Sequence, residues 1–323
     1  MARTLICTLL LLAWNVTASA QILDVRELNT DQIARLDRAR TVVLVTAGIL
    51  EEHGPFLPSY SDGYQSEFIA TRVAEAVAGR SSWTVLRFPD IPLGAFPASY
   101  VGRKYVFPGS YPVRMATLRA VFMDLATDLG EAGFRWVVVV TMHGGPTHNR
   151  ALDEAARYFN DSYAGRMVHV TGLASVAGAA PSDIFTNEQR AAEGLSIHAD
   201  ADEHSCLLFL RPDLVAPAIR SAPAIVTHDF AQLVATAETP NWPGYFGTPA
   251  IANPEAGRRA MGAIAQAAVN VVLKVLDGGS DEGPRSADRS TAEPAFRRVV
   301  EAALEYERQI ERKQAEWLAK QQR

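Results

Sequence analysis

Two short runs of mainly β-branched and apolar residues constrain the fold of this chain most strongly. Residues 41–45 and 134–141 are too short for helices and are almost uniformly apolar, as in strands that are covered on both faces. Further strand signals and stretches with helical apolar spacing alternate with them: strands near 83–86 and 168–171, and helices near 66–78, 115–129, 150–159 and 254–276. This alternation predicts an α/β fold with a mostly parallel sheet.

A first group of candidate functional residues follows the strand at 41–45. Glu51 and His53 are two positions apart, so in an extended segment their side chains point the same way. Gly54 then turns the chain, and Asp62 on the returning loop is close enough to reach them. Carboxylates and an imidazole together favour a divalent-metal site. Taken alone, surface acids and an N-capping aspartate explain this trio at least as well.

Two more groups strengthen the metal interpretation. His143 follows the strand at 134–141, and the two glycines after it let the backbone approach a ligand closely. The segment 198–205 contains two histidines and three carboxylates and precedes an apolar run. Because ligands of open α/β sheets bind outside the carboxyl ends of strands, these groups can meet at one edge. Together they fit a two-metal hydrolytic centre, although no single group is diagnostic.

The same segments resemble the creatininase (creatinine amidohydrolase) family. The first motif is Glu-x-His-Gly-Pro with a later Asp, and the others are Phe-Pro-Gly-Ser, His-Gly-Gly, His-Ala with Glu and Ser, and a late Gly-x-Pro. They occur in the family's order and spacing over about residues 35–275, at 48–62, 107–110, 142–145, 198–205 and 247–257. This resemblance implies a three-layer α/β/α fold and metal-dependent hydrolysis of a C–N amide bond.

The resemblance also implies roles for individual residues. Glu51 and His143 would hold one ion, and Asp62 would bridge it to a second ion held by His53 and a further carboxylate. The ligand types suit two divalent ions, Zn²⁺, Mn²⁺ or Fe²⁺, without choosing among them. His198 corresponds to a histidine that moves a proton to the leaving nitrogen, with a purely structural role as the alternative.

The last metal carboxylate is the least certain part of the predicted site. Creatininase itself takes it from the position that is Gly145 here, so we expect Glu203, with Asp202 and Asp200 as substitutes. Creatininase also has a substrate-packing tyrosine where this chain has Gly144. We therefore expect a substrate other than creatinine, either another cyclic amide, a formamide or a short peptide.

The first twenty residues predict export. Residues 1–20 contain Arg3, an apolar stretch at 5–14 and small residues at 18–20, as in a signal peptide cleaved before Gln21. The apolar stretch has about ten residues, whereas a membrane-spanning helix needs roughly 20. We expect a secreted or periplasmic protein with no membrane contact after cleavage.

Composition and cysteine content exclude some other classes. A net charge of −5 gives no reason to expect binding to nucleic acid. Cys206 is the only cysteine beyond the signal peptide, so no intrachain disulfide can form, and we expect it to pack in the core rather than act as a nucleophile. The Gly-x-Ser-x-Gly elbow of many serine hydrolases is absent from the sequence.

The remaining sequence predicts the domain organisation. We expect a catalytic domain at 21–277, a flexible Gly/Ser/Asp-rich linker at 278–294 and an amphipathic helix at 295–323. This helix is either solvated or an oligomer contact, and we expect a homo-oligomer. The alternative to an enzyme is an inactive binding protein of the same fold that presents this helix to a partner.

Overall fold

A computed structural model describes residues 21–321 of the chain, so the predicted signal peptide lies outside the described residues. Within this range one sheet has five strands, and every pair of neighbours is parallel. In sheet order the strands are β1 (Gln21–Asp24), β3 (Thr84–Arg87), β2 (Thr41–Thr46), β4 (Trp136–Val140) and β5 (Arg166–His169). The predicted α/β class with a parallel sheet is confirmed.

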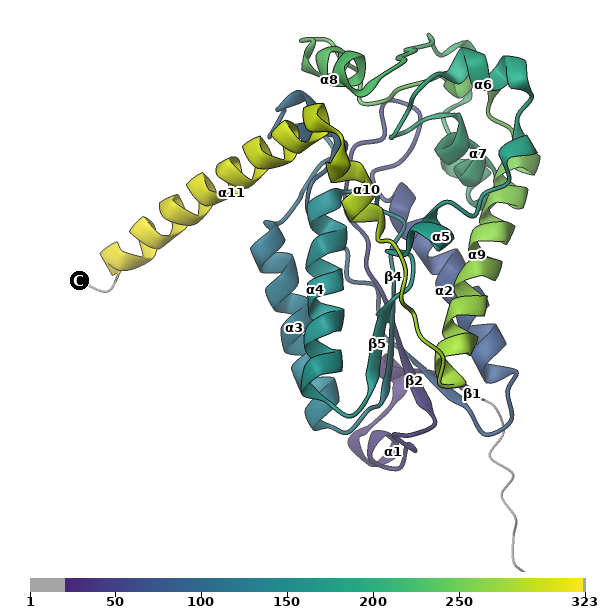
Figure 1. Ribbon diagram of the computed structural model, residues 1–323, viewed down its shortest axis with the longest axis vertical. Helices are drawn as coiled ribbons and strands as arrows, with labels where there is room; N and C mark the ends of the chain where they lie inside the picture. Colours follow the sequence, from purple (N-terminus) through teal and green to yellow (C-terminus); the bar gives the residue numbers. More distant parts are fainter. Residues whose placement is uncertain (1–20, 322–323) are drawn as a thin grey trace, which may run out of the picture.

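Helices cover both faces of the sheet (Figure 1). On one face lie α2 (Ser61–Ala78) and α9 (Pro254–Leu276), and on the other lie α3 (Met115–Glu131) and α4 (Pro146–Ser162). Residues of β2 alternate between the two cores, with Val42 and Leu44 in one and Val43 and Val45 in the other. Burial on both faces explains why this strand is apolar at almost every position.

Two helices begin earlier than the sequence predicted. Helix α2 begins at Ser61, so Asp62 lies in its first turn and not on a returning loop, as we expected. Helix α4 begins at Pro146, directly after Gly145, because proline has no N–H to lose in the first turn of a helix. The structure therefore places Asp62 at the N-terminal end of α2.

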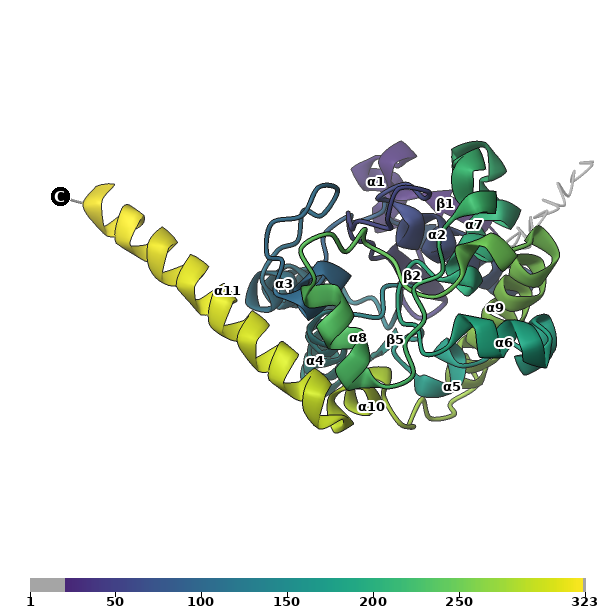
Figure 2. The same ribbon diagram turned by 90° about the horizontal axis from the view of Figure 1, so that it is seen from above.

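The remaining helices lie mainly above the carboxyl ends of the strands (Figures 1 and 2). They are α1 (Thr30–Ala34, at the opposite end), α5 (Ala174–Ala177), α6 (Asn187–Glu193), α7 (Ala201–Leu210), α8 (Phe230–Glu238), α10 (Ser286–Ala292) and α11 (Pro294–Gln321). By length and composition α9 is the one helix in the described part that could cross a membrane. Its apolar side belongs to the core that α2 and α7 also form.

The segment predicted as a linker is not structureless. Helix α10 occupies part of residues 278–294, and Ala287 in it is buried. The Arg285 guanidinium lies 3.5 Å from the Asp153 carboxylate of α4, and the backbone N–H of Ser286 donates to the Gly172 carbonyl at 2.9 Å. These long-range contacts hold the segment against the body, although its local composition is typical of a linker.

Helix α11 divides into a packed half and a projecting half. Its first turns bury Phe296, Val299 and Ala303 in an apolar cluster shared with α8. Its last turns extend away from the body, and Trp317 there is 61% exposed (Figures 1 and 2). The folded body therefore continues beyond residue 277 and includes the start of α11.

Candidate metal centre

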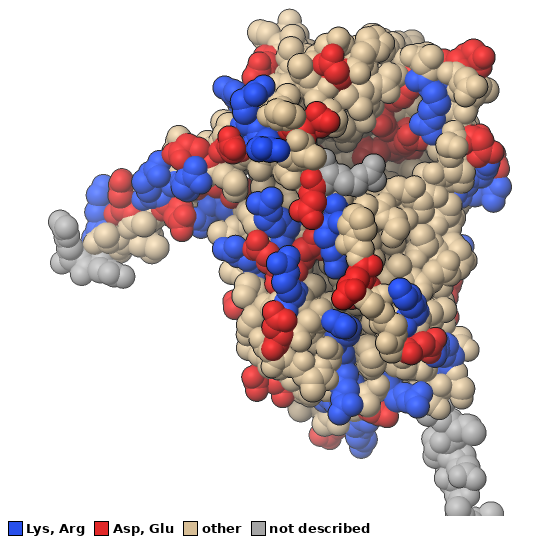
Figure 3. Space-filling view, in the orientation of Figure 1, with Lys and Arg blue, Asp and Glu red and all other residues tan. Residues whose placement is uncertain are grey.

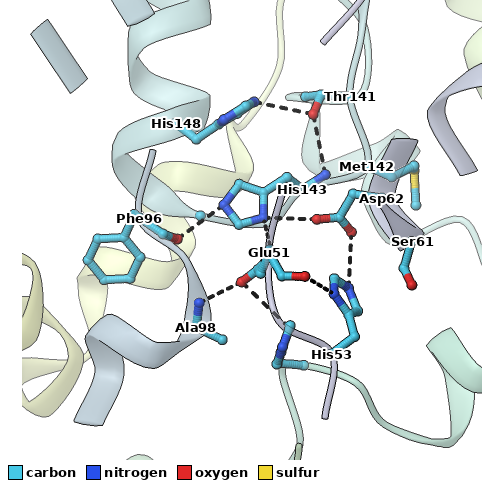
Figure 4. A network of polar contacts seen from close by, with 12 residues as sticks. Glu51, His53, Ser61, Asp62, Phe96, Ala98, Thr141, Met142, His143 and His148 are labelled. Carbon is cyan, nitrogen blue, oxygen red and sulfur yellow. Dashed lines mark hydrogen bonds and ion pairs between the residues drawn. The ribbon is translucent and has the colours of Figure 1, made fainter. Parts of the chain in front are cut away.

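The candidate site lies at the carboxyl ends of the adjacent strands β2 and β4. Glu51 and His53 follow β2, and His143 follows β4 (Figure 4). Asp62 enters from the first turn of α2, where the positive end of the helix dipole favours a carboxylate. Glu203 enters from the first turn of α7. Segments that are far apart in the sequence thus meet at one edge of the sheet.

Two groups of side chains in this site could each hold a metal ion. One consists of Glu51, Asp62 and His143, and the other of His53, Asp62 and Glu203, with candidate ligand atoms within 4.8 Å of one another in each group. Nδ1 of His143 lies 2.8 Å from Oε2 of Glu51 and 3.2 Å from Oδ2 of Asp62. The Asp62 carboxylate belongs to both groups.

The second group is slightly more open than the first. Nε2 of His53 lies 3.6 Å from Oδ1 of Asp62 and 3.6 Å from Oε2 of Glu203. These separations are too long for hydrogen bonds, and an ion between the atoms would have room. The side chain of Glu203 is 25% exposed, whereas those of His53 and Asp62 are almost fully buried.

Backbone carbonyls fix which nitrogen of each histidine faces the carboxylates. Nε2 of His143 lies 3.0 Å from the Ala95 carbonyl oxygen, and Nδ1 of His53 lies 3.1 Å from the Glu51 carbonyl oxygen. A carbonyl can only accept, so these nitrogens carry hydrogen. In the neutral ring the other nitrogen then has a lone pair directed at the carboxylates, which is the arrangement expected of metal-binding histidines.

His198 lies at the edge of the same cluster. Its Nε2 donates to the Glu52 carbonyl oxygen at 2.5 Å, so Nδ1 is the nitrogen that faces the site. Nδ1 is 3.7 Å from Oε1 of Glu51 and 4.0 Å from Oε2 of Glu203. With Glu51 and His53 it forms a third group that could hold a metal ion. Its position thus allows either metal binding or proton transfer.

The charges in the site fit a divalent cation. Nε2 of His53 is buried without a hydrogen-bond partner, and Oδ2 of Asp62 makes no well-aligned hydrogen bond although Nδ1 of His143 lies 3.2 Å away. Among the side chains that the structure describes, no Lys or Arg pairs with Glu51, Asp62 or Glu203. Buried carboxylates need a compensating positive charge. Imidazole and carboxylate ligands at these separations suit Zn²⁺, Mn²⁺ or Fe²⁺.

The pKa shifts show how the site compensates its charge with protons. Burial alone would lower the pKa of His53, but the Asp62, Glu203 and Glu51 carboxylates raise it to about 10. Burial would raise the pKa of Asp62, but His143 and His53 hold it well below its usual range. Burial raises the pKa of Glu203 to about 8, against the effect of His53. A metal ion would have to displace such protons, so the affinity for metal should decrease as the pH is lowered.

The structure separates the three carboxylates considered for the last ligand. Oδ1 of Asp200 accepts the backbone N–H of Glu203 at 3.0 Å and so caps α7. Oδ2 of Asp202 pairs with the Arg190 guanidinium at 2.9 Å. Oε2 of Glu203 accepts the Ala199 N–H at 2.6 Å and faces His53. Glu203 is therefore the one of the three that joins the candidate metal groups.

The sequence interpretation missed His148, which supports His143. The two rings meet edge to face with centroids 4.9 Å apart. Nδ1 of His148 accepts the Ala95 N–H at 3.3 Å, and Nε2 lies 3.2 Å from Oγ1 of Thr141 (Figure 4). Burial lowers the pKa of His148 well below its usual value, so the ring is a neutral packing partner. His148 lies in the first turn of α4, and its position in the sequence does not indicate a contact with His143.

A cavity of about 320 Å³ opens above the carboxylates. In Figure 3 a hollow in the upper half of the molecule contains acidic side chains, and acidic and basic side chains are interspersed over the rest of that face. Cys206 is not among the described residues that line the cavity. It is buried in an apolar core and burial raises the pKa of its thiol, as expected of a packing residue.

The comparisons with known proteins agree with this geometry. A family model described as creatininase, creatinine amidohydrolase, matches residues 26–272. The chain belongs to the creatininase family. No curated protein matches this chain.

Solved creatininase structures share its fold. A protein from Bacteroides fragilis NCTC 9343 assigned as a creatinine amidohydrolase matches with a TM-score of 0.59 and 21% identity, covering 80% of this chain and 98% of that one. A structure described as "Creatininase Mn" matches with a TM-score of 0.56 and 21% identity over 79% and 98% of the two chains. A mutant creatininase described as Zn-Zn type has a TM-score of 0.54 and 21% identity, over 78% and 98%.

Proposed function

We propose that this chain is an exported metal-dependent amidohydrolase of the creatininase family, which hydrolyses a C–N bond in a small amide. The observation that carries the proposal is the buried Asp62 carboxylate, shared between two groups of candidate ligands. Membership of the family supports hydrolysis. The expected substrate classes are cyclic amides, formamides and short peptides, and we also propose that the exported protein is a homo-oligomer.

The proposed cofactor is a pair of divalent ions. Glu51 and His143 would hold one and His53 and Glu203 the other, with Asp62 between them. Relatives described with manganese and with two zinc ions support these metals. When bound, two such ions supply a nucleophilic water of lowered pKa and polarise the amide carbonyl.

The proposed role of His198 is proton transfer. Its Nδ1 faces the cavity, and burial lowers its pKa to about 4, so the ring is neutral at pH 7 and can accept a proton. The nearby Glu51 and Glu203 carboxylates would stabilise the cation that results. His198 would take a proton from the attacking water as its oxygen bonds to the carbonyl carbon, and would then give that proton to the departing nitrogen as the C–N bond breaks.

An activity panel tests this proposal. The full protein is stripped with a chelator, reloaded with Mn²⁺ or Zn²⁺ and offered small lactams, N-substituted formamides and dipeptides, with amine release as the readout. We expect turnover of at least one class by the reloaded protein and none by the stripped protein. A folded, metal-loaded protein without activity on the whole panel would favour the alternative, a catalytically inactive binding protein.

A further inference from the structure

The cavity above the candidate metal centre is lined by two chemically distinct sets of residues. One set consists of the carboxylates and histidines already described. The other set is apolar, is called the apolar end below, and consists of Phe96, Ala98, Val101, Ile197, Phe230 and Phe296. The two sets adjoin, because the Ala98 N–H donates to Oε1 of Glu51 and the Phe96 carbonyl lies 3.1 Å from Nε2 of His143. A volume of about 320 Å³ is near the lower limit for small-molecule sites, which usually have roughly 300–1,000 Å³. The cavity therefore suits a compact molecule with one polar and one apolar end.

Three phenylalanines from separate elements form the apolar wall. Phe96 precedes a short helical turn, Phe230 begins α8, and Phe296 lies in the first turn of α11. The Phe296 ring centroid is 6.0 Å from that of Phe96 and 5.6 Å from that of Phe230. Phe296 lies beyond residues 26–272, so the segment outside the family match completes this wall.

Phe296 in this wall belongs to the packed interior of the protein. Phe296 is only 4% exposed, and its neighbours Val299 and Val300 are buried in the same cluster. Just before it in the chain, Nη1 of Arg285 contacts Asp153 at 3.5 Å and the His169 carbonyl at 3.4 Å. The segment that carries Phe296 is thus anchored to the sheet and to α4.

The cavity lining disfavours a charged group at the apolar end. None of its described residues is Lys or Arg, so the described lining offers no cationic partner for a substrate carboxylate. The charged groups that line the cavity are the carboxylates and histidines of the metal centre. Gly144 also lines the cavity, and a Cβ on it would have no atom within 4 Å, so nothing fills the space over it. An uncharged aromatic or branched aliphatic group is what this end can bury favourably.

We propose that the substrate is a neutral amide with a compact aromatic or branched apolar group next to the scissile bond. That group would pack against Phe96, Phe230 and Phe296. This inference rests on the proposed function, because it assumes that the amide carbonyl lies at the metal centre. It adds that the C-terminal extension helps to determine specificity.

Hydroxamic acids test the inference, because the hydroxamate binds metal and its tail can be varied. The full-length protein loaded with Zn²⁺ is titrated calorimetrically with acetohydroxamic, phenylacetohydroxamic and succinohydroxamic acids. We expect the phenyl compound to bind roughly 10–100-fold more tightly than the acetyl compound, since its ring leaves water for the apolar end. We expect the carboxylate-tailed compound to bind no better than the acetyl compound.

Phenylalanine variants test which side chains produce the preference for the phenyl compound. Phe230 is half-buried, and Phe230→Ala should reduce the preference for phenyl over acetyl by roughly 2–10-fold. Phe296→Leu, which keeps an apolar side chain in the cluster, should reduce it in the same direction. Phe209→Ala is the matched control, because Phe209 is also half-buried but meets the ring of Phe68 edge to face outside the cavity, so it should leave the preference unchanged.

The outcomes separate the two proposals. Equal affinity for the acetyl and phenyl compounds, or tighter binding of the carboxylate-tailed one, would overturn the inference while leaving the metal centre intact. An equal loss of preference in the Phe209→Ala control would also overturn it. Failure of the metal-loaded protein to bind any hydroxamate would overturn the proposed metal centre and the inference with it.

Discussion

His198 and Glu203 are five positions apart and both face the carboxylate cluster, yet their surroundings differ. Glu203 directs Oε2 at the ring of His53 from 3.6 Å, within a candidate metal group shared with Asp62. His198 lies with Nδ1 at the edge, in the wall of the cavity. We therefore propose metal binding for Glu203 and proton transfer for His198.

Two alanine variants test this assignment. His198→Ala should keep its metal content near that of the wild type but reduce turnover by roughly 10²–10⁴-fold, the usual contribution of a positioned acid–base group. Glu203→Ala should lose about one ion, because it removes a charged ligand from one of the two groups. Metal analysis and steady-state kinetics on the same preparations measure both quantities.

Asp202→Ala provides the matched control. Asp202 is in the same turn of α7 but pairs with Arg190, away from the cluster. Its removal should change neither metal content nor turnover substantially. Loss of metal from His198→Ala but not from Glu203→Ala would reverse the two roles, a possibility that the third candidate group allows.

Some of the site could be predicted from the sequence, because motif spacing after strands identifies residues that meet at a sheet edge. Glu51, His53 and His143 were found in this way. His148 and Phe296 could not be, since their roles arise from packing between segments far apart in the chain. Periodicity within one element contains no information about such contacts.

At the scale of elements, α11 is attached to the body partly through a buried carboxylate. Glu307 is 7% exposed, and its Oε2 accepts the backbone N–H of Met115 at 2.9 Å, at the start of α3. Burial raises the pKa of Glu307 to about 7, although the Met115 hydrogen bond and Arg114 work against this shift. Attachment of this helix should therefore depend on pH.

The direction of this pH dependence follows from the raised pKa of Glu307. The folded protein holds the Glu307 proton more tightly than the unfolded chain, whose glutamate has its ordinary pKa near 4.5. The contribution to stability is fully present below about pH 4.5 and is lost as the pH rises through about 7. Glu307→Gln, which stays neutral, should therefore gain about 1–3 kcal/mol relative to wild type between pH 5 and pH 8.

Urea denaturation of both proteins at the two pH values measures this difference. Glu301→Gln is the control, because Glu301 is exposed on the same helix and should give the same small difference at both pH values. A wild type and a Glu307→Gln variant with parallel pH profiles would show that Glu307 is not a buried acid.

The contrast between predicted and observed elements has a physical cause. The long core helix α9 was predicted at 254–276 and is found there. Its apolar residues recur at helical spacing, and they form the side of the helix that is buried in the core. The segment 278–294 was misjudged because its polar, glycine-containing composition is typical of linkers, whereas Arg285 contacts Asp153 of α4 and Ala287 is buried.

For the whole molecule, we expect the exported protein to begin at Gln21. This residue begins β1, which pairs in parallel with β3, so cleavage after Ala20 would leave the described fold complete. N-terminal sequencing of protein from the periplasm or culture medium of an expressing bacterium checks this. Retention of Met1 on the cytoplasmic protein would contradict export.

The central claim is that one buried carboxylate serves two metal ions, and the metal content of Asp62→Ala tests it most directly. Elemental analysis of the wild type, purified and reloaded with Mn²⁺ or Zn²⁺, should find about two ions per chain. Asp62→Ala should lose both ions, because Asp62 is common to the group with Glu51 and His143 and the group with His53 and Glu203. A folded Asp62→Ala protein that keeps both ions, or a wild type that binds none, would contradict the claim.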